Sequence, residues 1–117
     1  MAYVDGFVLA VPKKNLAAYA KISRAAGRVW REHGALEYRE CAGDDVNTQM
    51  GVSFPRMAKA RAGETVVFSW IVYKSRAHRD RVNKKVMKDP RLTSMKGPMP
   101  FDIKRMAYGG FKVIVDL

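Results

Sequence analysis

The sequence predicts an α+β domain in which four antiparallel strands form one sheet and two helices cover one of its faces. Two observations predict this class. Strand-like and helix-like segments follow one another in the order β, α, β, β, α, β, which is the split βαβ pattern of the ferredoxin-like fold. The chain has 117 residues, enough to bury the core of a single domain, so residues 1–117 are expected to form one unit.

The first half of the chain predicts a strand, a helix and a second strand. Residues 3–11 are rich in β-branched and aromatic types, which favour a strand. Residues 15–33 carry apolar side chains at helical spacing, and Gly34 offers a left-handed stop. Residues 35–44 alternate polar and apolar side chains and indicate the second strand, and residues 45–65 are expected to be irregular apart from a short turn of helix or a short strand.

The second half predicts a strand, a helix, a loop and a last strand. Residues 66–73 are the strongest strand of the chain, because almost all of them are β-branched or aromatic. Ser75 is expected to cap a helix that ends near residue 88. Residues 96–102 contain two prolines and predict a loop, and residues 108–116 predict a strand whose paired glycines allow a bulge or a close backbone approach.

Both faces of the predicted sheet are apolar. In the third strand Val66, Phe68, Trp70 and Val72 point one way, and Val67, Ile71 and Tyr73 point the other. The first and last strands repeat this pattern, yet two helices cover one face only. We therefore expect a dimeric α+β barrel, a homodimer that packs sheet to sheet with Trp70 or Tyr73 in or beside the interface.

Composition bounds the class of protein. The hydrophobic share of 48% is typical of a globular chain. A single cysteine cannot form an internal disulfide, and there is no apolar stretch long enough for a membrane span and no leader-like N-terminus, so we expect a cytoplasmic protein. The sequence has no phosphate-binding loop, no dinucleotide glycine pattern and no zinc spacing, and therefore implies no cofactor and no metal site.

The net charge of +11 lies on the predicted helices. The first helix with its lead-in and residues 74–91 together hold 14 basic residues against three acids, whereas the predicted strands hold two basic residues against five acids. This partition disfavours an RNA-recognition sheet, although Phe68, Trp70 and Tyr73 resemble its stacking aromatics. A solvated helix surface is the favoured interpretation of the basic stripe, and polyanion contact through these helices stays open as an alternative.

Several linked motifs resemble one family. They are Tyr3-Val4-Asp5-Gly6-Phe7, Cys41-x-Gly43-Asp44-Asp45-Val46, Phe68-Ser69-Trp70-Ile71, the run from Arg79-Asp80-x-x-Asn83 to Asp89-Pro90-Arg91, and the run from Met99-Pro100-Phe101-Asp102 to Tyr108-Gly109-Gly110-Phe111. Across nearly the whole chain the sequence is similar to the YbaA-like bacterial family of unknown function. The resemblance implies a dimeric α+β barrel. It transfers no catalytic residue, because no activity is established for the family; barrels of this type include small monooxygenases, isomerases and haem-degrading enzymes.

Three residues are candidates for a site between the sheet and the helices, where a small, largely apolar ligand could bind. His78 is expected to share the inward face of its helix with Val82 and Val86, and would be a proton carrier. Trp70 would be a stacking wall, and Asp5 a base or orienting group with a raised pKa. The alternative is a non-enzymatic dimeric binding module in which the three residues are structural. Cys41 is expected to be a small packed thiol.

Overall fold

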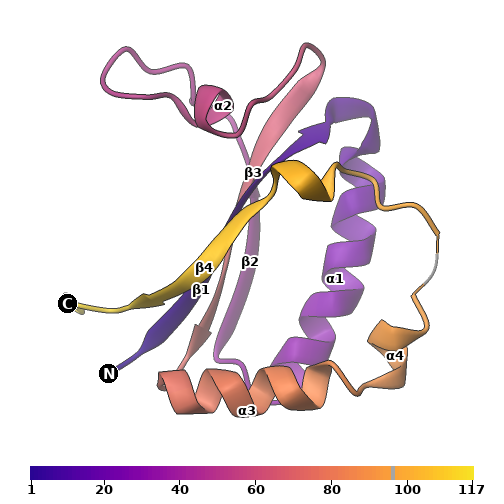
Figure 1. Ribbon diagram of the computed structural model, residues 1–117, viewed down its shortest axis with the longest axis vertical. Coiled ribbons are helices and arrows are strands. Elements are labelled where there is room, and N and C mark those ends of the chain that lie inside the picture. The colour runs from indigo at the N-terminus through magenta and orange to yellow at the C-terminus, as the bar shows by residue number, and fades with distance from the viewer. Residues whose placement is uncertain (96) are drawn as a thin grey trace.

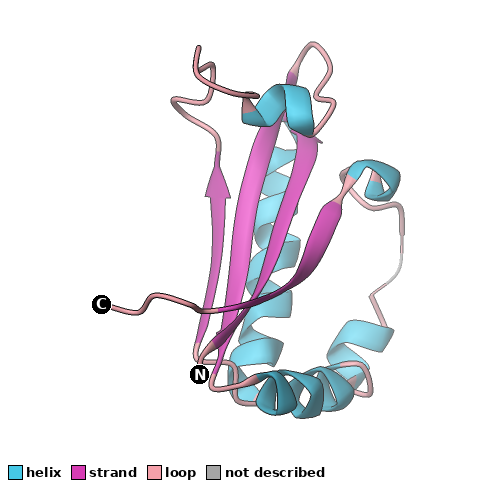
Figure 2. Cartoon of the chain, turned by 60° about the vertical axis from the view of Figure 1, so that its left-hand side comes forward, coloured by secondary structure: helices cyan, strands magenta, loops and turns pink. Residues whose placement is uncertain are grey.

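The computed structural model describes residues 1–95 and 97–117. Four strands form a single sheet with the order β2-β3-β1-β4, and all neighbouring strands are antiparallel. They are β1 (Tyr3–Pro12), β2 (Glu37–Ala42), β3 (Glu64–Tyr73) and β4 (Ala107–Lys112). Figure 2 shows the strands side by side with a long helix behind them. The predicted α+β fold with a four-stranded antiparallel sheet is confirmed.

The two main helices begin and end where local sequence signals place them. A 3₁₀ turn, η1 (Lys13–Asn15), leads into α1 (Leu16–Glu32). Gly34 lies just after this helix and has a positive φ of 117°. Helix α3 (Arg76–Val86) starts after Ser75, whose hydroxyl accepts a hydrogen bond from the His78 amide at 3.1 Å. Both predicted helices are therefore present, and the predicted cap at Ser75 is confirmed.

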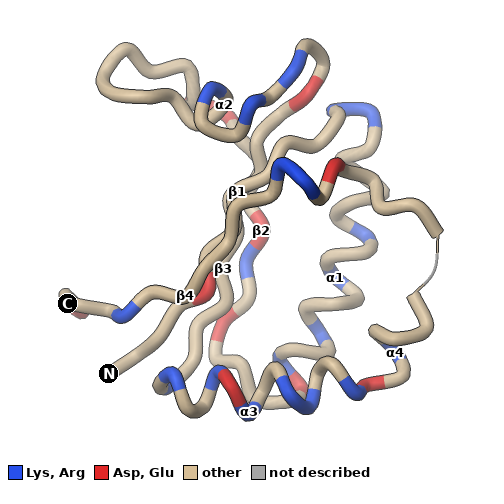
Figure 3. The backbone as a smooth tube through the Cα atoms, viewed as in Figure 1, with Lys and Arg blue, Asp and Glu red and all other residues tan. Residues whose placement is uncertain are grey.

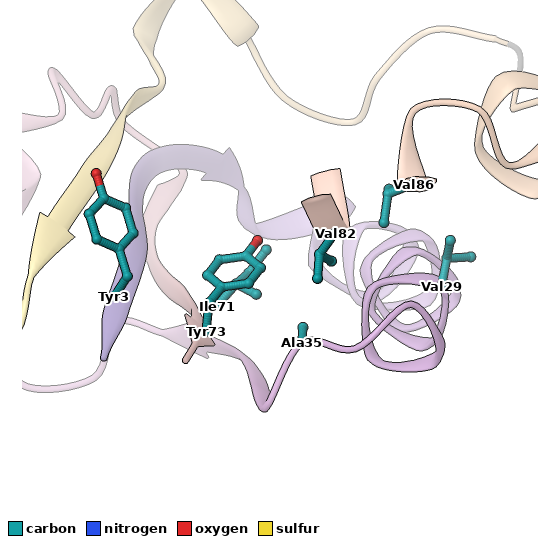
Figure 4. Close-up of a cluster of buried hydrophobic side chains, with 7 residues drawn as sticks. All are labelled: Tyr3, Val29, Ala35, Ile71, Tyr73, Val82 and Val86. Carbon is teal, nitrogen blue, oxygen red and sulfur yellow. The ribbon is translucent and has the colours of Figure 1, made fainter. Parts of the chain in front are cut away.

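The two helices cover the sheet unequally. Helix α1 runs along one face, whereas α3 crosses the end of the sheet below it (Figure 1). The expectation that both helices lie along one face is thus wrong for α3. Only Val82 and Val86 of α3 are buried, so the helix has a short apolar contact that suffices for one end of the core. The core cluster at this end draws its side chains from β1, α1, the segment before β2, β3 and α3: Tyr3, Val29, Ala35, Ile71, Tyr73, Val82 and Val86 (Figure 4).

Three short helical turns complete the fold, of which the first lies in the predicted irregular segment 45–65 and the other two lie on either side of the predicted loop. They are α2 (Phe54–Met57), α4 (Pro90–Thr93) and the 3₁₀ turn η2 (Ile103–Arg105). Each is capped by a side-chain oxygen, from Ser53, Asp89 and Asp102 respectively. In the predicted loop at 96–102, residues 97–102 form neither helix nor strand, as expected. Lys96 lies outside the described residues.

The last strand is shorter than predicted. Strand β4 ends at Lys112, which is opposite Tyr3, the first residue of β1. Residues 113–117 therefore have no residues of β1 opposite them with which to extend the sheet. The Val113 amide donates one further hydrogen bond, to the Ala2 carbonyl at 3.2 Å. The tail projects away from the side of the sheet that carries α1 (Figure 1). The paired glycines do allow a close approach, because a Cβ built on Gly110 would lie 2.3 Å from the Tyr3 hydroxyl oxygen.

The second face of the sheet is largely bare in this chain. The segment that contains α2 reaches over its upper end, where Phe54 packs edge-on against Phe68 with ring centroids 6.0 Å apart. Below this contact no helix crosses the face (Figure 1). Within the described residues, no helix has the length and apolar character needed to cross a membrane.

Candidate functional site

The bare face holds an apolar trough of about 700 Å³. Its lining comes from β1, β3 and β4 together with Met57 of α2: Val4, Gly6, Phe7, Val8, Met57, Phe68, Trp70, Ala107, Tyr108, Gly109 and Phe111. No lining residue is charged. The Phe111 ring lies over Gly6, where a Cβ would come to 3.4 Å from the ring, an ordinary van der Waals contact. The trough therefore offers no basic contact for a nucleic-acid backbone.

Trp70 and Tyr73 lie on opposite faces of β3. Trp70 lines the trough, and its indole nitrogen donates to Glu37 Oε1 at 2.9 Å. Tyr73 is fully buried on the helix side. Cys41 pairs with Phe68 across β2 and β3, and its side chain is exposed. The prediction of a packed thiol is wrong, because β2 is an edge strand and Cys41 lies on the face of the sheet opposite α1.

Asp5 is buried on the helix side of β1 and forms an ion pair. Its carboxylate accepts from Arg79 Nη1 at 2.7 Å, and the Arg79 guanidinium lies 4.9 Å above the Tyr3 ring. Burial raises the pKa of Asp5 above its usual value, while the charge of Arg79 and hydrogen bonds from Arg79, Tyr73 and Asn83 oppose that shift. Since its partner is a fixed cation from α3, Asp5 ties the end helix to the sheet.

His78 is half-buried beside Tyr73, at the start of α3. Its Nδ1 accepts from the Lys74 amide at 2.9 Å, and its ring meets the Tyr73 ring edge-on with centroids 6.0 Å apart. Burial lowers its pKa, and the charges of Lys74, Arg81 and Lys85 add to that shift. The histidine is therefore held neutral and used locally as a hydrogen-bond acceptor.

The three predicted site residues do not share one lining. Asp5 is opposite Ile71 in the sheet, whereas Trp70 is opposite Gly6, and neighbouring positions on a strand point to opposite faces. Asp5 and His78 both lie near Tyr73 on the helix side, while Trp70 faces the trough. The predicted joint site of His78, Trp70 and Asp5 is wrong for this geometric reason.

A different hollow lies between the sheet and α1. It is a cavity of about 220 Å³. Its walls come from β1, β2, β3, α1 and the segment before β4: Phe7, Leu9, Tyr19, Ile22, Ser23, Ala26, Trp30, Tyr38, Arg39, Glu40, Ser69, Trp70, Ile71, Met99, Phe101 and Met106. Most of these side chains are apolar. The cavity is thus the place in the fold where a small, largely apolar molecule fits.

The segment before β4 is fastened over this cavity. Phe101 meets Tyr19 edge-on, with ring centroids 5.6 Å apart. Arg105 holds the segment down, because its two Nη atoms bond the two carboxylate oxygens of Glu64 at 2.7 Å each. These hydrogen bonds and one from the Arg61 amide lower the pKa of Glu64 to about 2, so the pair stays ionised at neutral pH.

One polar cluster interrupts the apolar wall. Glu40 accepts a hydrogen bond from the Tyr19 hydroxyl at 2.8 Å and another from the Tyr38 hydroxyl at 3.0 Å. Ser23 is buried beside both phenols. Burial and, after it, the Glu40 charge raise the pKa of Tyr19 and of Tyr38, so both phenols stay protonated and keep donating to the carboxylate.

Sequence reasoning missed this cluster, although two spacings could have indicated it. Tyr38 and Glu40 are two residues apart on a strand, so they share a face. Tyr19, Ser23 and Gly27 are four residues apart on a helix, so they also share a face. The sequence contains no signal that brings these two faces together, because their contact depends on how α1 crosses β2.

At Gly27, α1 packs directly against Tyr38 of β2. A Cβ built on it would lie 2.6 Å from Tyr38 Cδ1, so the ring occupies the space that any side chain would need. We expect Gly27→Ala to destabilise the fold. Overpacking of this kind costs about 1–3 kcal/mol, which exceeds the gain of at most about 1 kcal/mol in helix propensity. Urea unfolding measures the difference.

The background variant Tyr38→Ala tests the cause. With the ring removed, Gly27→Ala should become neutral or stabilising, because only the propensity gain remains. Stabilisation by Gly27→Ala in the otherwise unchanged protein would contradict the steric explanation.

Charge is concentrated away from the sheet. Blue basic segments follow α1 and α3 in Figure 3, and few charges lie on the strands. Among residues 1–95 and 97–117, no three His, Cys, Asp or Glu side chains gather closely enough to hold a metal ion. Candidate features for binding therefore include the apolar trough, the cavity with its polar cluster, and the basic surface of α1.

Comparisons with known proteins agree with this class of molecule, an α+β protein with one four-stranded antiparallel sheet. A family model described as "Protein of unknown function (DUF1428)" matches residues 2–103, and the chain belongs to that family. It is 47% identical over 116 residues to "Uncharacterized protein YbaA" of Escherichia coli strain K12, with 99% of each chain covered. The same identity and coverage hold for the protein of that name in Shigella flexneri.

Two solved structures are similar in fold. An uncharacterised NIPSNAP domain protein from Burkholderia xenovorans has a TM-score of 0.54 at 13% identity, covering 95% of this chain and 93% of that one. The de novo designed protein Foldit4 has a TM-score of 0.50 at 12% identity, covering 97% and 99%. At these identities the likeness concerns the fold alone. None of the four names assigns a ligand or a reaction, so the site is argued from its own geometry.

Proposed function

We propose that the protein is a small-molecule-binding subunit of a homodimer with the architecture of a ferredoxin-like, dimeric α+β barrel. The ligand occupies the cavity between the sheet and α1. The single observation that carries this proposal is the cavity itself, about 220 Å³ of mostly apolar wall interrupted by the Tyr19–Glu40–Tyr38 cluster. A concave apolar site with a few oriented polar groups is the usual form of a site for a small organic molecule.

The apolar trough supports the homodimer. Its occupant is a second copy of the chain, because two molecules of charge +11 repel each other wherever their charged surfaces meet, and the trough lining is uncharged. Phe68 and Phe111 are 43% and 61% exposed there, and exposing apolar surface to water costs free energy. A symmetric sheet-to-sheet contact would bury these side chains in both copies at once. The dimer leaves each cavity on the far side of its sheet, enclosed by that subunit's own α1.

Filling the cavity tests the binding site. Ala26 of α1 lines the cavity, and its neighbour Ala25 is exposed and does not. We expect the unaltered protein and Ala25→Leu to bind 1-octanol in isothermal titration calorimetry, and Ala26→Leu to lose binding because its larger side chain takes the ligand's volume. Equal binding by both variants, or no binding by the unaltered protein, would contradict the proposal.

The alternative function is a dimeric module that contacts a polyanion through its basic helices. It rests on the exposed residues Lys21, Arg24, Arg28 and Arg31 of α1. That surface lies outside the cavity, so the Ala26→Leu variant distinguishes the two: polyanion contact would be unchanged by it. The cavity is the better supported site because buried and half-buried side chains of β1, β2, β3 and α1 converge on it, whereas a basic helix surface also arises from solubility alone.

A further inference from the structure

Another hollow, a groove of about 480 Å³, lies on the outer side of the polar cluster, between α1 and β2. It shares Ser23, Tyr38 and Glu40 with the cavity, so these three residues form the boundary between the two hollows. Its remaining charged lining comes from α1: Arg24, Arg28, Arg31 and Glu32.

The arginines of this groove are available to a ligand. Among residues 1–95 and 97–117, Arg24 and Arg28 make no ion pair and no side-chain hydrogen bond, and Arg31 donates to the Leu36 carbonyl. Both acids of the groove are already engaged. Glu32 pairs with Arg91, and the carboxylate oxygens of Glu40 each accept a phenol hydroxyl. The unengaged charge beside the boundary is therefore positive.

The boundary is formed by the same side chains on both sides, because Ser23, Tyr38 and Glu40 line both hollows. The Tyr38 ring lies directly against Gly27, and Glu40 is hydrogen-bonded to both phenols. A molecule that spans both hollows would have to displace side chains of this boundary, and it would then reach from the arginines of the groove to the apolar walls of the cavity. This sequence of environments, charged outside and apolar inside, matches an amphipathic molecule rather than a wholly apolar one.

We propose that the ligand is an amphipathic organic anion, a carboxylate whose apolar body occupies the cavity and whose head binds Arg24 and Arg28 in the groove. This inference rests on the proposed function, because it assigns the chemical class of the molecule held in the cavity. Guanidinium groups suit a carboxylate because they donate two parallel hydrogen bonds as well as charge. The two arginines are one helical turn apart on one face of α1 and can act on one head group.

Comparing octanoate with 1-octanol separates the contribution of the charged head to affinity from that of the apolar body, since the two molecules differ in charge but have similar alkyl chains. In isothermal titration calorimetry at low ionic strength, we expect octanoate to bind more tightly than 1-octanol to the unaltered protein. The double variant R24Q/R28Q should bind octanoate about five- to tenfold more weakly, the effect of two exposed charge pairs, and bind 1-octanol as before. The control K84Q/K85Q removes the same charge from exposed positions of α3 and should change neither affinity.

The variant Glu40→Gln gives an effect of opposite sign. It removes the acid that faces the groove and keeps a side chain able to accept from a phenol, so octanoate affinity should rise about two- to fivefold relative to the affinity of the same variant for 1-octanol. Binding of both ligands with no effect of R24Q/R28Q, or an equal loss in K84Q/K85Q, would overturn this inference and leave the cavity proposal standing. Binding of neither ligand would overturn the cavity proposal itself.

Discussion

Phe111→Glu is expected to convert a dimer into a folded monomer of 13.2 kDa. Phe111 is 61% exposed in the single chain and lies in the apolar trough, so a monomer tolerates glutamate there. In a symmetric sheet-to-sheet dimer the substitution buries two unpaired carboxylates, each of which costs several kcal/mol. The dimer should weaken by about two orders of magnitude or more. Light scattering over a micromolar concentration series measures the mass, and circular dichroism checks the fold.

Met87→Glu is the matched control. Met87 is 59% exposed, almost as much as Phe111, but it lies at the end of α3 and outside the trough. The control should remain a dimer of twice the chain mass. A monomeric unaltered protein, or a dimer that survives Phe111→Glu, would show that the trough is not the interface.

Arg79→Met is expected to be the most destabilising single change in the end helix. It leaves the Asp5 carboxylate, which is 6% exposed, without its cation. Loss of one partner of a buried ion pair costs about 3–5 kcal/mol, and the lower end applies because the Arg79 side chain is 19% exposed. Urea unfolding at neutral pH measures the loss. Arg76→Met, an exposed position on the same helix, is the control and should cost little.

The loss should depend on pH with a definite sign. The pKa of Asp5 is already raised by burial, and removal of Arg79 takes away the opposing charge, so it rises further. A carboxyl group with a raised folded-state pKa contributes stability below its unfolded value, and that contribution is lost as pH rises through the folded value. The cost of Arg79→Met should therefore grow from pH 4 to pH 7. A cost that is constant over this range, or one matched by Arg76→Met, would contradict the role of the ion pair.

Local sequence signals predicted the elements well because each signal acts within a few residues. Ser75 caps α3 through an amide three residues away, and Gly34 reverses the chain after α1 by its own φ. The two apolar faces of β3 were also predicted, since alternation along a strand decides which side each residue takes. By contrast, the end of β4 is decided by where its partner β1 begins, and no signal within residues 108–116 carries that information.

The site was predicted poorly for the same reason. Asp5 and Trp70 were grouped although the register between β1 and β3 separates them by face, and a register cannot be obtained from either strand alone. The crossing of α1 over β2, which brings Tyr19 to Glu40, is likewise a tertiary fact. The raised pKa predicted for Asp5 is found, but the partner that opposes this shift is Arg79, a cation 74 residues away in the sequence.

The central claim is that a small molecule enters the cavity between the sheet and α1, and Trp30 can report it. Trp30 lines the cavity and, with Trp70 replaced by phenylalanine, is the only tryptophan of the chain. We expect 8-bromo-1-octanol, whose bromine quenches indole on contact, to quench Trp30 emission saturably, and Ala26→Leu to abolish this quenching. No saturable quenching of Trp30, or quenching of Trp30 that survives Ala26→Leu, would contradict the cavity as the binding site.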